Sequence, residues 1–544
     1  MADQIMAESK PPKPGLLRQI LWWIWVILLT ALMVLGLVFA APWKVITLIA
    51  IFLAAATILP KIYRKWFWLA VGLVVLTITV WIFLPDDNKD WRPYTFDKKL
   101  AQLQAKYAVP DSENAAIVYD KIIADWKQKE ANEPNLPHDW QTVALKGFWL
   151  SKDQPEIAAY VQYYQNTIEQ LVEVSKFEKC SFPITADLFI MGEQLKRTTA
   201  MRQWARLLVA SGNNDIAEGN TSDAIEKYLV AIRMGQNASQ QPSAMDFLVG
   251  IACEALAMGS INNFVVCGDA NEFYLGKLDR AVSGIRHDWN SDLTGFIDSE
   301  KLFFKNLWGI MCYQVNVQGK IRFSHDPSGM LRELTRKMPG DEMADGNDIF
   351  SGYWYKKLMK AHTIPYWFYM PETPEKLGEI IDASFDKHYA MTKPDFDWSK
   401  ESEMPPEFHY KINIQQLAEL MAKINKGVYP ALHDNYLRIA AQQRGTLLII
   451  AMRRYKNVNG QWPEKLEDIK NSVPPEILVD PFNGNSFVYK RTEENFTLYG
   501  KGENGIDEDG KHEYSWPAKP GADDLQIWPY KSKVSKQQEQ KANE

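Results

Sequence analysis

Oxygen-bearing side chains gather in one short, glycine-rich stretch near the C-terminus, GENGIDEDG from Gly502 to Gly510. The carboxylate and amide groups in this stretch are those of Glu503, Asn504, Asp507, Glu508 and Asp509. Such a cluster repels itself unless a cation or hydrogen-bond donors neutralise it, and Ca²⁺ takes about six to eight oxygens from flexible loops. Glycines allow the backbone angles that a ligating loop needs. The stretch therefore indicates either a calcium site or a solvated acidic loop.

Sequence signatures of common enzymes are missing from the chain. Residues 505–512, GIDEDGKH, lack the Ser or Thr that ends a phosphate-binding P-loop, and their carboxylates repel phosphate. None of the eight histidines has another three or four residues away, which excludes helical zinc-protease motifs, and no GxSxG elbow occurs. We therefore expect a protein that is not an enzyme, although residues distant in sequence can still form a catalytic site.

The acidic stretch belongs to an ordered series of short motifs. These are NGQWPEKL from Asn459, DPFNGNSFVY from Asp480, LYGKGENGIDEDG from Leu498 and GADDLQIW from Gly521. Their order after a long helix resembles the globular head of the major pseudopilins of type II secretion. In that family carboxylates of the last loop bind Ca²⁺, so the resemblance nominates Asp507, Asp509, Asp523 and Asp524 as ligands. The chain departs from the family at Ser486, where a proline is common, and its helix lacks the family's apolar N-terminal half.

A helix and a small sheet are needed to position these motifs. Leu432 to Tyr455 has the 3.6-residue periodicity of an amphipathic helix. Two alternating segments, Ser486–Lys490 and Phe496–Tyr499, predict strands, and Asp480–Asn485 predicts a hairpin turn. We therefore expect an α+β, pseudopilin-like head over residues 431–530, followed by a disordered polar tail over 531–544.

Most of the chain before the head reads as helices. Asp111 to Glu113 predict the cap of a helix that runs through Trp126, and Pro155 to Phe177 predict a second helix. Trp204 to Met234 match one tetratricopeptide (TPR) hairpin, in which small residues let two helices approach closely. Because only one copy occurs, we expect a packed helical hairpin (204–234) within an α-helical body over residues 86–430.

Charge and cysteine content limit the partners and the scaffold. The net charge of −6 and the pI of about 5.9 give no basic field, so nucleic acid is not an expected partner. The cysteines are Cys180, Cys253, Cys267 and Cys312. They form no CxxC pair and are too widely spaced for a disulfide scaffold. We expect four buried thiols, with one disulfide in an oxidising compartment as the alternative.

Three apolar segments precede the body, and they predict a membrane anchor over residues 20–85. Ile20–Ala41 is an uncharged run that spans about 33 Å as a helix, Trp66–Leu84 is similar, and Val45–Leu59 is shorter. Tryptophans cluster at the ends of these segments, as at membrane interfaces. A cleaved signal peptide is a poor alternative, because the first run is too long and no cleavage site follows it.

Flanking charges predict the orientation of the anchor. Basic residues precede the first segment in the tail 1–19 and follow the second at Lys61, Arg64 and Lys65, whereas acidic residues follow the third. The positive-inside rule then places the N-terminus in the cytoplasm and the large C-terminal part outside it, at a bacterial cytoplasmic (inner) membrane. If the short middle segment is re-entrant, the large part faces the cytoplasm instead.

Two functions remain open from the sequence. The arrangement as a whole resembles membrane-anchored proteins of planctomycete-type bacteria, through stretches such as WRPYTF at 91–96 and DFLVGI at 246–251. That resemblance implies no activity. We expect a non-enzymatic scaffold or adaptor of the cell envelope that is anchored in the lipid bilayer and binds a protein partner. The alternative is a membrane-tethered hydrolase or ligand-binding protein with a cleft in residues 285–410. A pocket with convergent carboxylates or histidines would favour this alternative, and a broad apolar patch would favour the adaptor.

Overall fold

The structure is a computed structural model, and it describes residues 91–184, 188–323, 373–393, 396–398, 414–511 and 522–529. The predicted tail 1–19, the anchor 20–85 and the polar tail 531–544 lie outside these residues. The membrane anchor, its orientation and the placement of the body outside the cytoplasm therefore stay predictions.

The described chain is mainly helical, with two small antiparallel sheets. It divides into two compact units. The described part of the smaller unit contains the sheet of β1 (Trp91–Pro93), β2 (Tyr313–Asn316) and β3 (Ile321–Phe323), with β2 in the centre. In this sheet Trp91 lies opposite Asn316, and Tyr313 lies opposite Phe323.

The larger unit contains nearly all of the helical residues. In chain order the helices are α4 (Asp97–Lys106), α5 (Ala115–Glu130), α6 (Trp140–Lys146), α7 (Pro155–Tyr163), α8 (Gln165–Val174), α9 (Leu188–Ala217), α10 (Thr221–Ser239), α11 (Ala244–Cys267), α12 (Glu272–Ser283), α13 (Trp289–Cys312), α17 (Pro374–Phe385) and α18 (Ile414–Asn459). Among the described residues, two 3-10 turns lie between these helices, at Asp111–Glu113 and Asp386–Thr392, and two more follow α18, at Leu466–Ile469 and Pro475–Leu478.

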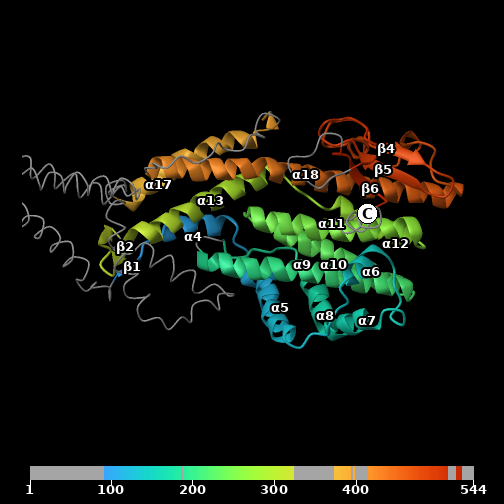
Figure 1. The fold of residues 1–544 in the computed structure, drawn as a ribbon, viewed down its shortest axis with the longest axis horizontal. Helices are drawn as coiled ribbons and strands as arrows, with labels where there is room; N and C mark the ends of the chain where they lie inside the picture. Colours follow the sequence, from blue (N-terminus) through green and yellow to red (C-terminus); the bar gives the residue numbers. More distant parts are fainter. Residues whose placement is uncertain are drawn as a thin grey trace, which may run out of the picture. The chain divides into compact units, whose positions relative to one another are not determined.

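Helices α9, α10 and α11 pack side by side and form the centre of the body (Figure 1). Their close approach depends on glycines: a Cβ on Gly212 would lie 2.6 Å from the ring of Tyr228, and one on Gly250 would lie 2.5 Å from the carbonyl oxygen of Gly235. Gly219, with φ of +85°, ends the turn between α9 and α10. The predicted hairpin is thus a pair of closely packed helices, and its likeness to a TPR unit stays a prediction.

Two helix boundaries differ from those predicted. The N-cap of α5 is Asn114, whose Oδ1 accepts from the backbone N–H of Ala116 at 3.1 Å, whereas Asp111 to Glu113 form a 3-10 turn. Asn114 also holds the backbone of Ser181, so a contact distant in sequence fixes the start of the helix. The single helix predicted over Pro155–Phe177 is two, α7 and α8, which break at Tyr164; this fully buried ring stacks on Trp126.

Helix α11 is the single described helix that is long and apolar enough to cross a membrane. However, 67% of its apolar window is buried inside the protein. It packs against α9, α10 and α18, as expected of the core helix of a globular domain. Its apolar composition is therefore explained by the core of the body.

The C-terminal sheet lies against the last part of α18 (Figure 1). Its strands β4 (Val488–Arg491), β5 (Phe496–Gly500) and β6 (Leu525–Trp528) are antiparallel, with β5 in the centre. A Cβ on Gly445 would overlap Ile527, so a glycine lets this sheet reach the helix. The two predicted strands are present within two residues of their predicted bounds. The expected boundary between body and head, at residues 430 and 431, falls inside α18, which begins at Ile414 and continues through Pro430.

All four cysteines are free thiols, as expected, but only two of them are buried. Cys253 and Cys312 lie in the core, Cys180 is partly buried and Cys267 is exposed. The expectation of four buried thiols was therefore wrong for Cys267, which lies at the end of α11 where that helix reaches the surface.

Candidate functional site

A cavity of about 280 Å³ lies in the helical body, between α9, the start of α11 and α13. Its apolar wall contains four phenylalanines, Phe182, Phe296, Phe303 and Phe304. Its polar lining includes Gln194, Arg197, Gln241, Asp246 and Glu300. A concave, mainly apolar space with a few polar groups is the usual form of a small-molecule site.

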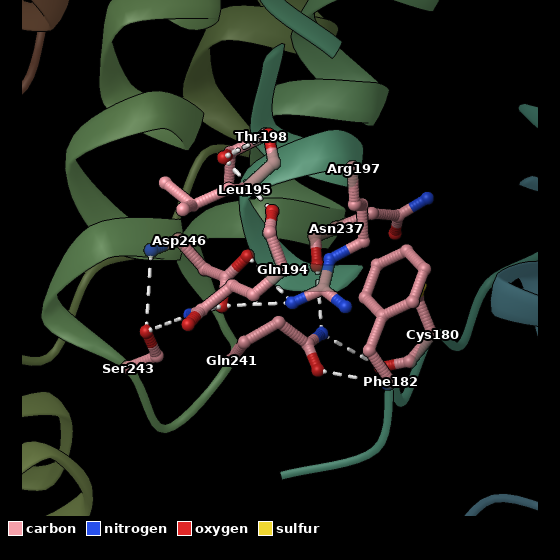
Figure 2. Close-up of polar contacts among 10 residues, drawn as sticks. All are labelled: Cys180, Phe182, Gln194, Leu195, Arg197, Thr198, Asn237, Gln241, Ser243 and Asp246. Atoms are coloured by element: carbon pink, nitrogen blue, oxygen red, sulfur yellow. Dashed lines mark hydrogen bonds and ion pairs between the residues drawn. The ribbon is translucent and has the colours of Figure 1, made fainter. Parts of the chain in front are cut away.

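An ion pair between Arg197 and Asp246 forms one side of the cavity (Figure 2). Nη2 of Arg197 donates to the two carboxylate oxygens of Asp246 at 2.9 and 3.0 Å. The side chains are only 7% and 3% exposed, so both charges are withdrawn from water. The guanidinium also lies over the ring of Phe182, 4.1 Å from its centroid. This packing holds the guanidinium plane in a fixed position beside the cavity.

Local sequence explains why Asp246 faces this side. Ser243 is the N-cap of α11, and its Oγ accepts from the backbone N–H of Asp246. A carboxylate in the first turn of a helix is stabilised by the unpaired N–H groups there. Gln194 on α9 donates from Nε2 to both Ser243 Oγ and Asp246 Oδ2, at 2.6 Å each. The cap of α11 and the polar face of α9 are thus joined in one network.

The segment that carries Phe182 is held in place by Gln241 (Figure 2). Gln241 accepts from the backbone N–H of Phe182 at 3.0 Å and donates to the carbonyl of Cys180 at 3.1 Å and to that of Asn237 at 2.7 Å. One buried amide therefore fixes the wall of the cavity to the end of α10.

The opposite wall is one face of α13. Phe296, Glu300, Phe303 and Phe304 lie at helical spacings of three and four residues, which brings them to the same side of the helix. Glu300 accepts a hydrogen bond from the hydroxyl of Tyr429 on α18 at 2.6 Å. Burial raises the pKa of Glu300 to about 7, in spite of this hydrogen bond, which favours the charged form.

Two buried polar atoms of the cavity lining have no hydrogen-bond partner within the described part of the protein. They are Nε of Arg197 and Oγ of Ser299, on side chains of residues that are 6% and 7% exposed. Buried polar groups are nearly always satisfied in native proteins, by protein or by another molecule. Both atoms have almost no exposed area, so they are unsatisfied groups packed beside the cavity rather than groups that face it.

The four carboxylates nominated from the sequence lie in the head, where the structure brings them together in two pairs. Asp524 is fully buried, and its Oδ2 accepts from the backbone N–H groups of Glu508 at 2.9 Å and Gly510 at 2.8 Å. Asp523 accepts from the backbone N–H of Asn504 at 3.1 Å and from its amide. These two residues hold the acidic loop closed. Burial raises the pKa of both.

The other pair, Asp507 and Asp509, lies on the exposed side of the loop. Oδ1 of Asp507 accepts from the hydroxyl of Tyr499 at 2.6 Å, which lowers the pKa of Asp507. Oδ1 of Asp509 binds the ammonium of Lys490 at 2.7 Å, and Oδ2 of Asp507 lies 3.9 Å from the same ammonium. A lysine therefore supplies the cation for this pair.

These oxygens fit a calcium ion in part. Oδ1 of Asp524 is buried and has no hydrogen-bond partner among the described residues, as a free ligand oxygen would be. The other nominated carboxylates already have protein donors. No group of three or more Asp, Glu, His or Cys side chains in the described ranges is arranged to hold a metal. The arrangement offers one prepared oxygen rather than a complete ligand set.

Another buried polar cluster, formed by Glu254, His287 and Ser239, lies within the helical body but outside the cavity lining. Oε2 of Glu254 lies 2.8 Å from Nε2 of His287, and Ser239 donates to Oε1 of Glu254 at 3.2 Å. Burial opposes protonation of His287, but the hydrogen bond and the charge of Glu254 outweigh it and raise the pKa of the imidazole. Burial raises the pKa of nearby Asp292 to about 7.

The sequence contains only weak signals for the cavity. Its residues come from 182–184, 194–197, 241–246 and 296–304, so no short motif joins them. The alternative function placed a cleft in residues 285–410. Most of residues 324–410 lies outside the described part of the chain, and from the described part of the range α13 supplies one wall of the cavity. The missed residues Arg197 and Asp246 lie in a polar helix face and a helix cap, patterns that occur in most helical proteins. Comparison of the chain with family models, with curated proteins and with solved structures finds no match.

Proposed function

We propose that the helical body binds a small, largely apolar molecule in the cavity between α9, α11 and α13. The observation that carries this proposal is a cavity lined by four phenylalanines and by polar side chains that contacts between helices hold in place, among them Arg197, Asp246 and Glu300. An apolar wall supplies affinity, and a few fixed polar groups supply orientation. The cavity is at the small end of the usual range, about 300–1,000 Å³, so the ligand is a small one.

This proposal favours the ligand-binding alternative over the adaptor. An adaptor surface is expected to expose a contiguous apolar patch. In the described ranges the large apolar side chains that are exposed are spread over six segments of the chain, and only Val428 and Val458 share an element, helix α18: Leu195, Leu248, Phe273, Val317, Val428, Val458 and Ile506. Single exposed apolar residues are normal on protein surfaces. Binding in the cavity needs no chemistry, so the protein is proposed as a binding protein and not as a hydrolase.

This proposal is tested by adding a neutral probe, 4-phenylbutan-1-ol, to the full-length chain and measuring its effect on hydrogen exchange and thermal unfolding. Amide hydrogen exchange should slow in residues 241–246 and 296–304, and the thermal unfolding midpoint should rise, because the probe binds only the folded state. Ser299→Phe and Ala244→Leu fill the cavity from two different helices and should abolish both effects.

A matched control is Ala158→Phe, which enlarges a partly buried side chain on α7, outside the cavity lining. It should leave the response to the probe intact. Protection of the same amides in both cavity-filling variants, with the helical circular dichroism of each unchanged, would contradict the proposal. So would the absence of any protection in the parent chain.

A second proposed function belongs to the head, and the buried, unpartnered Oδ1 of Asp524 favours it. We propose that residues 431–530 form a pseudopilin-like module whose last loop binds Ca²⁺ through Asp524 and its neighbours. The antiparallel β4–β5–β6 sheet packed on the end of α18, and the acidic loop closed by Asp523 and Asp524, support this proposal. In such a site Ca²⁺ would neutralise the carboxylates and fix the loop.

Hydrogen exchange in residues 502–510 of the full-length chain tests the calcium proposal. Extracellular calcium modules bind at about 10⁻⁴–10⁻³ M, and at ten times the dissociation constant the loop gains about 1.4 kcal/mol. Exchange should therefore slow about tenfold in millimolar Ca²⁺ relative to chelator. Asp524→Asn should remove the difference, whereas Glu503→Gln, which changes an acidic side chain of the same loop, should keep it. Equal exchange rates with and without Ca²⁺ would contradict the calcium proposal and would indicate a solvated acidic loop.

The third part of the proposal concerns the place of the protein in the cell. We propose a membrane-anchored protein of the bacterial envelope, with the body and head outside the cytoplasm. The support is the three apolar segments within residues 20–85 and the basic residues that flank them. Alkaline phosphatase fused after Pro85 should be active, and a reporter that fluoresces only in the cytoplasm should be dark. The reverse pair of results would place the body in the cytoplasm.

A further inference from the structure

The charges that line the cavity do not balance. Arg197 and Asp246 neutralise one another through two contacts of 2.9 and 3.0 Å. The remaining charged side chain of the lining is Glu300, and no described lysine, arginine or histidine forms an ion pair with it. With Glu300 ionised, the lining carries one net negative charge.

Cations close to Glu300 in sequence are already engaged elsewhere. Lys301 lies 2.7 Å from Oδ1 of Asp386 and 3.3 Å from Oδ1 of Asp382. Lys305 is also paired with Asp382. Both lysines thus have carboxylate partners on the segment 374–392, away from the cavity lining. A cation for Glu300 has to come from outside these pairs.

The hydrogen bonding of Glu300 is also incomplete. Its Oε2 accepts from the hydroxyl of Tyr429 at 2.6 Å, and no described group donates to Oε1. An ionised carboxylate has about four acceptor positions. Tyr429 is fully buried, so the hydroxyl holds the carboxylate in place from the side of α18.

Around this carboxylate the cavity wall is aromatic. Phe296, Phe303 and Phe304 lie four before, three after and four after Glu300 on α13, on the same helix face, and all three line the cavity. The face of a phenyl ring attracts a cation, by about 0.5–2 kcal/mol according to how dry the site is. A carboxylate among aromatic rings is the arrangement that recognises an organic ammonium group.

We propose that the ligand of this cavity is a small organic cation, a protonated amine with an aromatic or aliphatic body, whose nitrogen binds the carboxylate of Glu300. Its apolar part lies against Phe296, Phe303 and Phe304. This inference rests on the proposed binding function of the cavity and specifies the ligand class. Burial, which raises the pKa of Glu300 to about 7, is relieved when an ammonium group arrives, because the ion pair stabilises the charged carboxylate.

The test compares two probes of the same shape on the full-length chain, 4-phenylbutan-1-amine and 4-phenylbutan-1-ol. At neutral pH the amine carries a charge and the alcohol does not. Dissociation constants are measured by titration, with hydrogen exchange of residues 296–304 as the local readout. The parent chain should bind the amine at least about tenfold more tightly than the alcohol, which corresponds to about 1.4 kcal/mol.

Glu300→Gln keeps the shape of the side chain and an acceptor for Tyr429 but removes the charge. In this variant the amine should lose its preference, while the alcohol keeps its affinity. Glu173→Gln, on the exposed surface of α8, removes the same charge outside the cavity lining and should leave the preference unchanged. The anion 4-phenylbutanoate should bind the parent chain most weakly.

The outcomes separate the two proposals. If the alcohol protects the cavity amides but the amine binds no more tightly, or if the preference survives in Glu300→Gln, the cation is excluded and the binding cavity stands. If neither probe protects these amides, the binding function itself falls. A preference that disappears equally in Glu173→Gln would show a general effect of net charge and would overturn the role of Glu300.

Discussion

Buried and partly buried carboxylates are stabilised by different kinds of donor in the head and in the body. In the head, Asp480 and Asp524 accept hydrogen bonds from backbone N–H groups of the surrounding loops. In the body, Asp246 and Glu300 depend on side chains from other helices, and Glu254 depends on Ser239 of α10 and on His287 in the segment before α13. Every residue except proline carries a backbone donor, whereas a side-chain donor has to be placed by a separate element.

The two kinds of donor give the carboxylates different roles in the fold. In the head, a carboxylate that gathers N–H groups fixes the conformation of one loop, and its loss should be felt locally. In the body, a carboxylate that pairs with a distant side chain ties two helices together, and its loss should be felt by the whole unit. In the body, Glu300 and Asp246 also line the cavity, where the partner of a carboxylate can be an organic ligand.

Breaking the buried ion pair of the body should destabilise the protein more than any other change proposed here. Arg197→Met keeps most of the side-chain volume but leaves Asp246, which is 2% exposed, without its cation. An unpaired buried charge costs about 3–5 kcal/mol. The denaturant midpoint of unfolding, followed by tryptophan fluorescence, should fall accordingly.

A surface arginine provides the control for this prediction. Arg454 pairs with Glu272 and Asp279 on α12, whose side chains are 70% and 36% exposed, so Arg454→Met should cost less than about 1 kcal/mol. The double variant Arg197→Met, Asp246→Leu should recover much of the lost stability, because it removes the unpaired charge. Equal losses at the two arginines would break the distinction between the buried network and the surface.

The second effect is a fall in the stability of the body as the pH rises. Burial raises the pKa of Glu300 and of Asp292 to about 7, and the pKa of His287 is raised as well. In the unfolded chain these groups titrate near 4 for the carboxyls and 6.5 for the imidazole. The folded state thus binds more protons, and the stability that these groups contribute is full below pH 4 and is lost as the pH rises through 7.

Thermal unfolding midpoints should therefore decrease by several degrees between pH 5 and pH 8. Glu300→Gln and Asp292→Asn should each flatten this dependence, because each removes one of the titrating groups. A control substitution, Glu173→Gln on the surface, should leave the slope unchanged. A midpoint that rises over this range in the parent chain would contradict the prediction, because it would mean that ionising the carboxyls of the body does not destabilise the folded state.

Local patterns in the sequence were enough to predict two strands of the C-terminal sheet and the helical class of the body. The strands near Val488 and Phe496 alternate in polarity, the turn at Asp480 carries its own Asn and Gly, and the helix of residues 432–455 is periodic. Each of these signals is contained in a few neighbouring residues. The same is true of the acidic loop, where backbone donors and acidic acceptors lie within about twenty residues.

Long-range contacts decided the features that the sequence did not predict. Asn114 caps α5 while it holds Ser181, and Tyr164 interrupts the predicted helix where its ring stacks on Trp126. The cavity depends on contacts such as that between Glu300 and Tyr429, 129 residues apart in the chain. No local propensity encodes such a contact, so the site could not be found before the helices were placed.

The third effect tests the backbone-bound carboxylates of the head. Asp524→Asn keeps an acceptor for the N–H groups of Glu508 and Gly510 but removes the charge that strengthens both hydrogen bonds. The local loss should be about 1–2 kcal/mol. It should appear as about tenfold faster hydrogen exchange at these amides, with the amides of α9 to α11 unaffected.

Asp509→Asn is the matched control for this change in the loop. Asp509 is 80% exposed, adopts a positive φ of 58° that Asn tolerates well, and binds no backbone N–H with its side chain. Its substitution should leave the exchange of residues 508 and 510 unchanged. If Asp524→Asn instead lowered the unfolding midpoint of the whole body, the carboxylates of the head would stabilise the whole unit, as those of the body do, and not one loop alone.

The smallest effect is expected at Lys490, the cation that lies beside Asp507 and Asp509. Its side chain is 49% exposed, and exposed ion pairs contribute about 0.2–1 kcal/mol, so Lys490→Met should hardly change stability, and salt should reduce even that difference. The effect of Lys490→Met on the Ca²⁺ affinity of the loop is more informative than its effect on stability. Because the ammonium occupies the position of a competing cation, its removal should tighten Ca²⁺ binding by the loop, as read from hydrogen exchange of residues 502–510. Weaker Ca²⁺ binding in Lys490→Met would mean that the lysine orders the loop for the ion. Asp507 and Asp509 would then act together with Asp523 and Asp524 in shaping the loop, and the distinction between the two pairs would be lost.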